Sequence, residues 1–133
     1  MKVCIMIPAL SGGSRLPNKN LILVDGEPMS HYVIRAAKKS NYCSDIYINS
    51  DIPEMKLIAL SHNVNFFQRK ENFGGTKCNM SNKSASCNGG RCQVHDHYIY
   101  DFISEIECDY LIQVHTTSPL ITTESIDGFI QNM

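Results

Sequence analysis

Apolar residues follow two different spacings along this chain, and the two spacings alternate. Four short, mostly apolar runs have the length and character of buried parallel strands, at 3–7, 46–48, 64–67 and 110–114. Between them, apolar residues three or four positions apart predict amphipathic helices, over about 29–37, 55–59 and 98–106. A last helix is expected to begin at Thr122 or Thr123 and to run to Met133. Strand and helix therefore alternate, which predicts an α/β fold with a mostly parallel sheet and right-handed crossovers.

Local signals predict where several of these elements begin and end. Pro8 is expected to end the first strand, and Asp25-Gly26 to form a turn after a brief apolar piece. Asp51, with Glu54 three residues later, has the pattern of a capped helix start. The third helix carries a stripe that is expected to pack into the core, made of Tyr98, Ile99, Phe102, Ile103 and Ile106.

The predicted strand order brings three segments to one edge of the sheet. Strands one, two and three can lie side by side, with the fourth on the other flank of the first, which gives the order 3-2-1-4. In parallel sheets, ligands bind beyond the carboxyl ends of the strands. The loop after the first strand, Arg69 after the third and the turn at 115–119 after the fourth all reach that edge. The fourth strand has no Lys or Pro to protect its free edge, so we expect this chain to pair with another copy, exchange elements or aggregate.

The segment 7–20, IPALSGGSRLPNKN, is the strongest candidate for a binding loop. An apolar strand runs directly into small, flexible and cationic residues, a composition that allows backbone amides and side chains to surround phosphates. The loop carries only two cations, Arg15 and Lys19, which is few for a triphosphate. The alternative interpretation is that both are solvated loop charges.

Length and composition restrict the classes of function. The chain of 133 residues has the size of one domain, and its 43% hydrophobic and 19% charged residues are ordinary for a globular protein. A net charge of −1 offers no basic surface for nucleic acid, so any anion site must be local. The sequence has no apolar window of the roughly 18 residues that a membrane span needs, and its apolar start, broken by Pro8, lacks a cleavage pattern. We therefore expect a cytoplasmic protein with neither nucleic acid nor a membrane as partner.

The six cysteines fall into two groups. Those in or near apolar runs are expected to behave as small hydrophobic residues, namely Cys4, Cys43 and Cys108. The others lie in an irregular polar loop over 69–92, followed by His95 and His97, and are Cys78, Cys87 and Cys92. Their C-x8-C-x4-C spacing lacks the paired C-x2-C knuckles of a zinc site, so we expect free thiols and no bound metal.

Four motifs spread over the chain form a pattern that resembles one known family. The first is the loop with Pro8, Ala9, Leu16, Pro17, Lys19 and Asn20, and the second is D-G-x-P at 25–28. The third consists of the polar residues that follow strands two and three, Ser50-Asp51 and Arg69. The fourth is the turn H-T-T-S-P-L at 115–120. This pattern resembles the cytidylyltransferases that activate acidic sugars, the CMP-N-acetylneuraminate and CMP-Kdo synthetases. Their first loop reads approximately P-A-R-x-x-S-K-x-L-P-x-K-N, and their later turn reads Q-P-T-S-P-L.

The resemblance implies a fold and a reaction. The fold would be a three-layer αβα, Rossmann-like fold of the nucleotide-diphospho-sugar transferase (glycosyltransferase-A-like) type. Residues 1–133 would form a single nucleotidyltransferase-like domain, the N-terminal portion of a longer family domain. The partners would be CTP and a sugar acid whose anomeric hydroxyl attacks the α-phosphate with release of pyrophosphate, a step of lipopolysaccharide or capsule biosynthesis. The cofactor Mg²⁺ would be held by aspartates outside this chain, and the protein would be a homodimer.

The resemblance also implies which residues form the site. Lys19 and Arg15 would be the catalytic cations on the phosphates, Asn20 would bind the ribose or base, and Arg69 the cytosine edge. The nucleotide would contact a larger set, Ala9, Leu10, Ser11, Gly12, Gly13, Ser14, Asn20, Arg69, Ser84 and Ser86. The acidic sugar would contact His115, Thr117 and Ser118.

Three of the departures from the family pattern fall at positions that contact the ligands in that family. Leu10 stands where the family has an arginine and Ser14 where it has a lysine, and both family residues contact the triphosphate. His115 replaces a glutamine that lies by the sugar. Each lost cation costs about 1–3 kcal/mol of charge-assisted bonding. Two hypotheses therefore stand: a cytidylyltransferase that activates an acylneuraminate or Kdo-type sugar, and a degenerate relative that binds a nucleotide or sugar without turnover.

Overall fold

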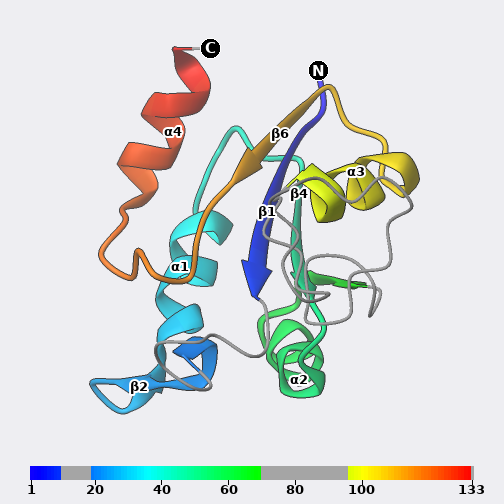
Figure 1. Ribbon diagram of the computed structural model, residues 1–133. Helices are drawn as coiled ribbons and strands as arrows, with labels where there is room; N and C mark the ends of the chain where they lie inside the picture. Colours follow the sequence, from blue (N-terminus) through cyan, green and yellow to red (C-terminus); the bar gives the residue numbers. More distant parts are fainter. Residues whose placement is uncertain (10–18, 70–95, 133) are drawn as a thin grey trace.

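The central element of the molecule is a four-stranded parallel sheet. The computed structural model describes residues 1–9, 19–69 and 96–132, without the side chains of Lys19, Asp96 and His97. The strands are β1 (Val3–Ala9), β4 (Asp45–Ser50), β5 (Asn65–Gln68) and β6 (Tyr110–Gln113). They pair in parallel in the order β5-β4-β1-β6, with β1 and β4 in the middle (Figure 1). The predicted order 3-2-1-4 is confirmed.

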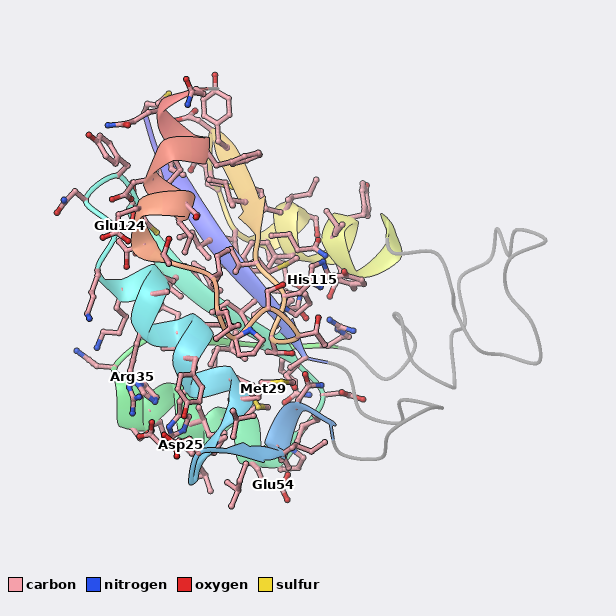
Figure 2. The ribbon with its side chains drawn as sticks, turned by 90° about the vertical axis from the view of Figure 1, so that its left-hand side faces the viewer. Asp25, Met29, Arg35, Glu54, His115 and Glu124 are labelled. Carbon is pink, nitrogen blue, oxygen red and sulfur yellow. The ribbon has the colours of Figure 1, made fainter. Side chains whose placement is uncertain are left out.

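A small antiparallel hairpin precedes the first long helix. After the short 3-10 helix η1 (Lys19–Leu21), β2 (Leu23–Val24) pairs with β3 (Glu27–Pro28). The turn residues Asp25 and Gly26 have φ of 51° and 80°, the left-handed backbone that a two-residue hairpin turn requires and that glycine adopts without strain. Arg35 of the following helix α1 (Met29–Lys38) donates two hydrogen bonds to the Glu27 carboxylate. Asp25 and Arg35 are labelled at the same end of the molecule in Figure 2.

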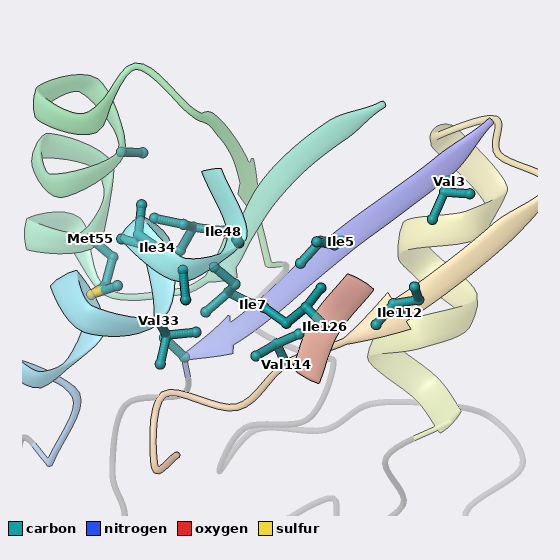
Figure 3. Packing of buried hydrophobic residues seen from close by; sticks show 14 of the residues in the cluster. Val3, Ile5, Ile7, Val33, Ile34, Ile48, Met55, Ile112, Val114 and Ile126 are labelled. Atoms are coloured by element: carbon teal, nitrogen blue, oxygen red, sulfur yellow. The ribbon is translucent and has the colours of Figure 1, made fainter. Parts of the chain in front are cut away.

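Helices cover both faces of the sheet. Because side chains alternate along a strand, Ile5 and Ile7 of β1 face one helical layer and Met6 faces the other. The first layer is built by α1, α2 (Pro53–His62) and α4 (Thr123–Gln131), and its cluster is drawn in Figure 3. On the second face α3 (Asp96–Glu105) packs Tyr98 and Phe102 against Met6 and Phe67. The predicted α/β fold in three αβα layers is confirmed for the described residues.

The first strand is longer than its sequence indicates. Pro8 was expected to end it, but β1 continues through Pro8 and Ala9, which lie opposite Asn49 and Ser50 of β4. The amide of Val114 donates to the Met6 carbonyl, so even-numbered residues of β1 direct their backbone groups toward β6. The described pairing with β6 stops at Met6, so the missing N–H of Pro8 costs no ladder bond.

The helix boundaries give one correction and one confirmation. Asp51 does not cap α2, because the N-cap position is Ile52 and carries no side-chain cap bond. Pro53 at the first helical position restricts the preceding residue to extended backbone, and Ile52 has ψ of 119°. For α4 the expected cap is confirmed, since Thr122 Oγ1 accepts a hydrogen bond of 3.1 Å from the Ser125 amide.

The stripe of α3 is only partly buried. Tyr98 and Phe102 are buried, and Ile99 and Ile106 pack against them in part, but Ile103 is 48% exposed. The prediction that the whole stripe packs into the core is therefore wrong for Ile103. Positions i and i+4 form the line that meets the sheet, and in the described structure the flank carrying Ile103 has no neighbouring layer.

The described cysteines are free thiols. Cys4 is fully buried, and Cys43 is half-buried against the core, as expected for small hydrophobic residues. Burial, with the neighbouring thiol of Cys108, raises the pKa of Cys4 to about 12. Cys78, Cys87 and Cys92 lie outside the described residues. Among the helices that are described, none has the length and apolar character needed to cross a membrane.

Candidate functional site

Arg69 is a buried cation at the carboxyl end of the sheet. It follows β5 directly, and its amide donates a hydrogen bond of 2.9 Å to the carbonyl of Ser50, the last residue of β4. Its side chain is 3% exposed. Nε donates to Asn49 Oδ1 at 3.1 Å and Nη2 donates to the Asn49 carbonyl at 3.3 Å. The Tyr98 ring of α3 lies against the guanidinium, with 4.1 Å from Cζ to the ring centroid.

Mainly neutral groups compensate this buried charge. Among the described residues the ion pairs are Lys2–Asp45 and Arg35–Glu27, so no carboxylate there lies within ion-pair distance of Arg69. Burial lowers the pKa of the Arg69 guanidinium, and Tyr98 and Asp51 partly oppose that shift. An arginine remains charged at neutral pH in such surroundings. The site therefore holds a positive charge that a ligand with acceptor or anionic groups can use.

A buried hydrogen bond joins the segment after the first loop to the turn after β6. Thr116 donates from Oγ1 to Oδ1 of Asn20, and both residues are 2% exposed. Asn20 belongs to η1, and Thr116 stands 96 residues later in the chain. Two of the motifs that the sequence placed at the carboxyl edge are thus in direct contact.

A second polar chain leads from Tyr98 to His115. Gln113 Nε2 donates to Tyr98 Oη at 2.9 Å and lies 3.1 Å from His115 Nε2. An amide nitrogen has two hydrogens, so it can serve both contacts when His115 Nε2 is the acceptor. His115 is exposed just beyond the end of β6 (Figure 2). The ring of Tyr98 therefore lies between the cation of Arg69 and the turn that begins at His115.

The structure places the remaining predicted residues only in part. Ala9 ends β1, buried, opposite Ser50. Thr117 and Ser118 are exposed in the turn after β6, where the Ser118 amide donates to the His115 carbonyl at 3.2 Å. Those outside the described residues are Leu10, Ser11, Gly12, Gly13, Ser14, Arg15, Ser84 and Ser86, and the Lys19 side chain is not described either.

Four residues of this arrangement were not predicted as site residues. They are Asn49, Tyr98, Gln113 and Thr116. A signal existed for Asn49, because it is a polar residue near the carboxyl end of an otherwise apolar strand, I-Y-I-N-S. Tyr98 was assigned to core packing, which is correct for its ring but leaves out the contact of that ring with Arg69.

The described residues contain no cluster of three or more potential metal ligands. Within 1–9, 19–69 and 96–132, no three His, Cys, Asp or Glu side chains come together in a way that could hold a metal ion.

Comparison with known proteins identifies the family. A family model described as "Cytidylyltransferase" matches residues 4–133. The chain is 27% identical to the 3-deoxy-manno-octulosonate cytidylyltransferase of Bdellovibrio bacteriovorus over 131 residues, which cover 98% of this chain and 45% of the relative. It is 34% identical to the CMP-N,N'-diacetyllegionaminic acid synthase of Legionella pneumophila over 62 residues, 47% of this chain and 27% of the relative.

A solved structure shares the fold. The structure of a CMP:2-keto-3-deoxy-manno-octonic acid synthetase complexed with CTP superposes with a TM-score of 0.77 at 20% identity, over 100% of this chain and 47% of that chain. The Rossmann-like fold expected from the sequence motifs is thereby confirmed. The match to the Bdellovibrio relative and the match to this structure cover nearly all of this chain but only about half of the length of each matched protein.

Proposed function

Because this chain belongs to the cytidylyltransferase family, we propose that it transfers CMP from CTP to an acidic sugar of the Kdo or acylneuraminate type, with release of pyrophosphate. The anomeric hydroxyl oxygen of the sugar would bond to the α-phosphorus of CTP while the bond to the bridging oxygen breaks. Such a reaction depends mainly on positioning and on neutralising charge. The observation that carries the proposal is the buried Arg69 at the carboxyl edge of β4 and β5, in a chain of this family.

Seven of the predicted residues have a specific role in the proposed reaction. Arg69 would donate to the base, and Asn20, held by Thr116, would bind the ribose or base. Lys19 and Arg15 would hold phosphates, and His115, Thr117 and Ser118 would line the sugar side. The assignment of Lys19, Arg15 and the rest of the first loop rests on the sequence motifs alone. Mg²⁺ would supply further neutralisation of phosphate charge, with ligands outside the described residues. A homodimer in the cytoplasm is also part of the proposal.

The test is a product assay with the purified chain. The protein is incubated with CTP, Mg²⁺ and Kdo or N-acetylneuraminate, and pyrophosphate and the CMP-sugar are measured by mass spectrometry. Arg69→Ala is expected to lower kcat/KM by about 10- to 100-fold, the value of hydrogen bonds from a charged group. Arg35→Ala is the matched control, because Arg35 is an exposed arginine on α1 whose guanidinium pairs with Glu27.

The outcomes separate the two hypotheses. Product formation that falls in Arg69→Ala and not in Arg35→Ala supports the proposed transferase. Tight binding of CTP without product, under every sugar tested, would contradict it and support the relative that binds without turnover. Leu10 and Ser14, which replace two cations of the family pattern, are the observation that favours this second hypothesis.

A further inference from the structure

The burial of Arg69 costs stability, which suggests that its position serves the function of the protein. Moving a guanidinium out of water is unfavourable unless its charge and its N–H groups find partners. Arg69 is 3% exposed, and its two partners for hydrogen bonds and stacking, Asn49 and Tyr98, are 0% and 4% exposed. All three are polar groups taken out of water at one place. An apolar side chain at position 69 would avoid this cost.

The contacts fix the guanidinium in one plane. Nε and Nη2 both donate to Asn49, one to its side-chain oxygen at 3.1 Å and one to its carbonyl at 3.3 Å. The Tyr98 ring covers a face of the cation at 4.1 Å, within the range of a cation–π contact. A guanidinium has five N–H donors in a rigid fork, and the described residues engage two of them. The plane of the remaining donors is therefore set before any ligand binds.

The holding groups are themselves anchored. The Asn49 side chain donates from Nδ2 to Met6 Sδ at 3.4 Å, and Asn49 is fully buried in the paired strand β4. Tyr98 Oη accepts from Gln113 of β6 at 2.9 Å. Arg69, which follows β5, thus contacts Asn49 of β4 and Tyr98 of α3, and Tyr98 is in turn hydrogen-bonded to Gln113 of β6.

We propose that Asn49 and Tyr98 are positioning residues, which hold the Arg69 guanidinium in the orientation that binds the acceptor edge of a pyrimidine base. This inference rests on the proposed function. Cytosine presents a carbonyl oxygen beside an unprotonated ring nitrogen, and both accept hydrogen bonds from a planar fork. Uracil carries a hydrogen on the corresponding ring nitrogen, which would face the donors of the guanidinium. The fixed plane of Arg69 therefore favours CTP over UTP.

The test measures binding of three probes to the full chain by calorimetry: CTP, UTP and inorganic tripolyphosphate. Asn49→Ala removes the side-chain acceptor and is expected to raise the Kd for CTP about tenfold, the value of one lost charged hydrogen bond. The Kd for tripolyphosphate is expected to stay within about twofold, because the positioned group acts on the base. Asn49→Asp keeps the acceptor and should restore most of the CTP affinity.

Two further variants separate positioning from general damage. Tyr98→Phe keeps the ring over Arg69 and should weaken CTP binding less than Tyr98→Leu, which removes the stacked face. Asn65→Ala is the matched control, because Asn65 is an exposed asparagine of the same sheet that donates to the Ile46 carbonyl at 3.1 Å. It should leave all three Kd values unchanged. Equal loss of CTP and tripolyphosphate affinity in Asn49→Ala, or no loss of either, would overturn the inference.

A measurement that needs no ligand tests the positioning of Arg69 separately from the proposed function. If wild-type protein binds no CTP, the proposed function fails, and the positioning is then measured without a ligand. The Nε–H proton of Arg69 is expected to exchange slowly with water in NMR spectra, and much faster in Asn49→Ala, with Nε–H of Arg35 as the internal reference. An Arg69 exchange rate that does not change in Asn49→Ala would contradict the positioning role.

Discussion

Replacing Thr116 by valine should destabilise the protein, because it removes the hydrogen bond between the turn after β6 and η1. Valine has nearly the shape of threonine but lacks the hydroxyl that donates to Asn20. Both residues are 2% exposed, so water cannot easily replace the lost partner. A buried group that loses its hydrogen-bond partner costs about 1–3 kcal/mol. We therefore expect the free energy of unfolding to fall by about 2 kcal/mol.

Urea denaturation followed by circular dichroism measures this change. For a small domain the dependence on urea is about 1–3 kcal/mol per molar, so the midpoint should fall by about 1 M at unchanged slope. Thr117→Val is the matched control, because Thr117 is the exposed neighbour in the same turn and should change stability by less than about 0.5 kcal/mol. A double-mutant cycle with Asn20→Ala should give a coupling energy of about 0.5–3 kcal/mol. Equal effects of Thr116→Val and Thr117→Val would refute the reasoning.

Three other predictions follow from particular contacts. The ring centroids of His31 and His62 lie 4.4 Å apart, and the pKa values of both side chains are lowered from 6.5. Burial is the main cause, followed by Arg35 for His31 and by His31 for His62. As the pH falls below about 6.5, the unfolded chain therefore binds protons before the folded chain does, so the free energy of unfolding should decrease toward pH 5. Urea titrations at pH 7.5 and 5.5 should show this fall, and His31→Gln should reduce it; an identical fall in the variant would contradict the assignment. Phe102→Ala should lower the free energy of unfolding by about 3–5 kcal/mol, since the ring is fully buried against Tyr47 and Phe67. Ile103→Ala on the exposed flank should lower it much less, and similar losses in the two variants would contradict this packing. The 133-residue protein should form dimers or larger species in sedimentation velocity at tens of micromolar, because β6 pairs with β1 on one side and has no described partner on the other, and a well-behaved monomer would speak against this.

The layers and strand order could be predicted because they depend on periodicity that is visible in the chain. The odd-numbered residues Val3, Ile5 and Ile7 belong to the large cluster, and the short apolar runs alternate with helical spacing. The exact ends of elements were less accessible. Whether Pro8 can stay in a strand depends on which neighbour its backbone faces, and that is a property of the assembled sheet.

The sequence predicted that the candidate site residues lie at one edge of the sheet, but it did not predict their contacts. Arg69, Asn20 and His115 were assigned from motifs, and the described structure brings their segments to the same edge of the sheet. The partners that hold them come from distant positions: Thr116 lies 96 residues from Asn20, and Asn49 lies 20 residues from Arg69. Such pairs share no local pattern, so spacing along the chain does not indicate them. The roles of the first-loop residues and of Ser84 and Ser86 stay predictions.

The most direct test of the account is a comparison of nucleotides on the full chain. CTP, ATP and GTP, each with Mg²⁺, are titrated into the purified protein by calorimetry. If Arg69 and Asn20 form a cytidine site, CTP should bind, weakly because Leu10 and Ser14 replace two cations of the family pattern, and it should bind more tightly than either purine nucleotide. Equal affinity for all three nucleotides, or no binding of any, would contradict the cytidine assignment.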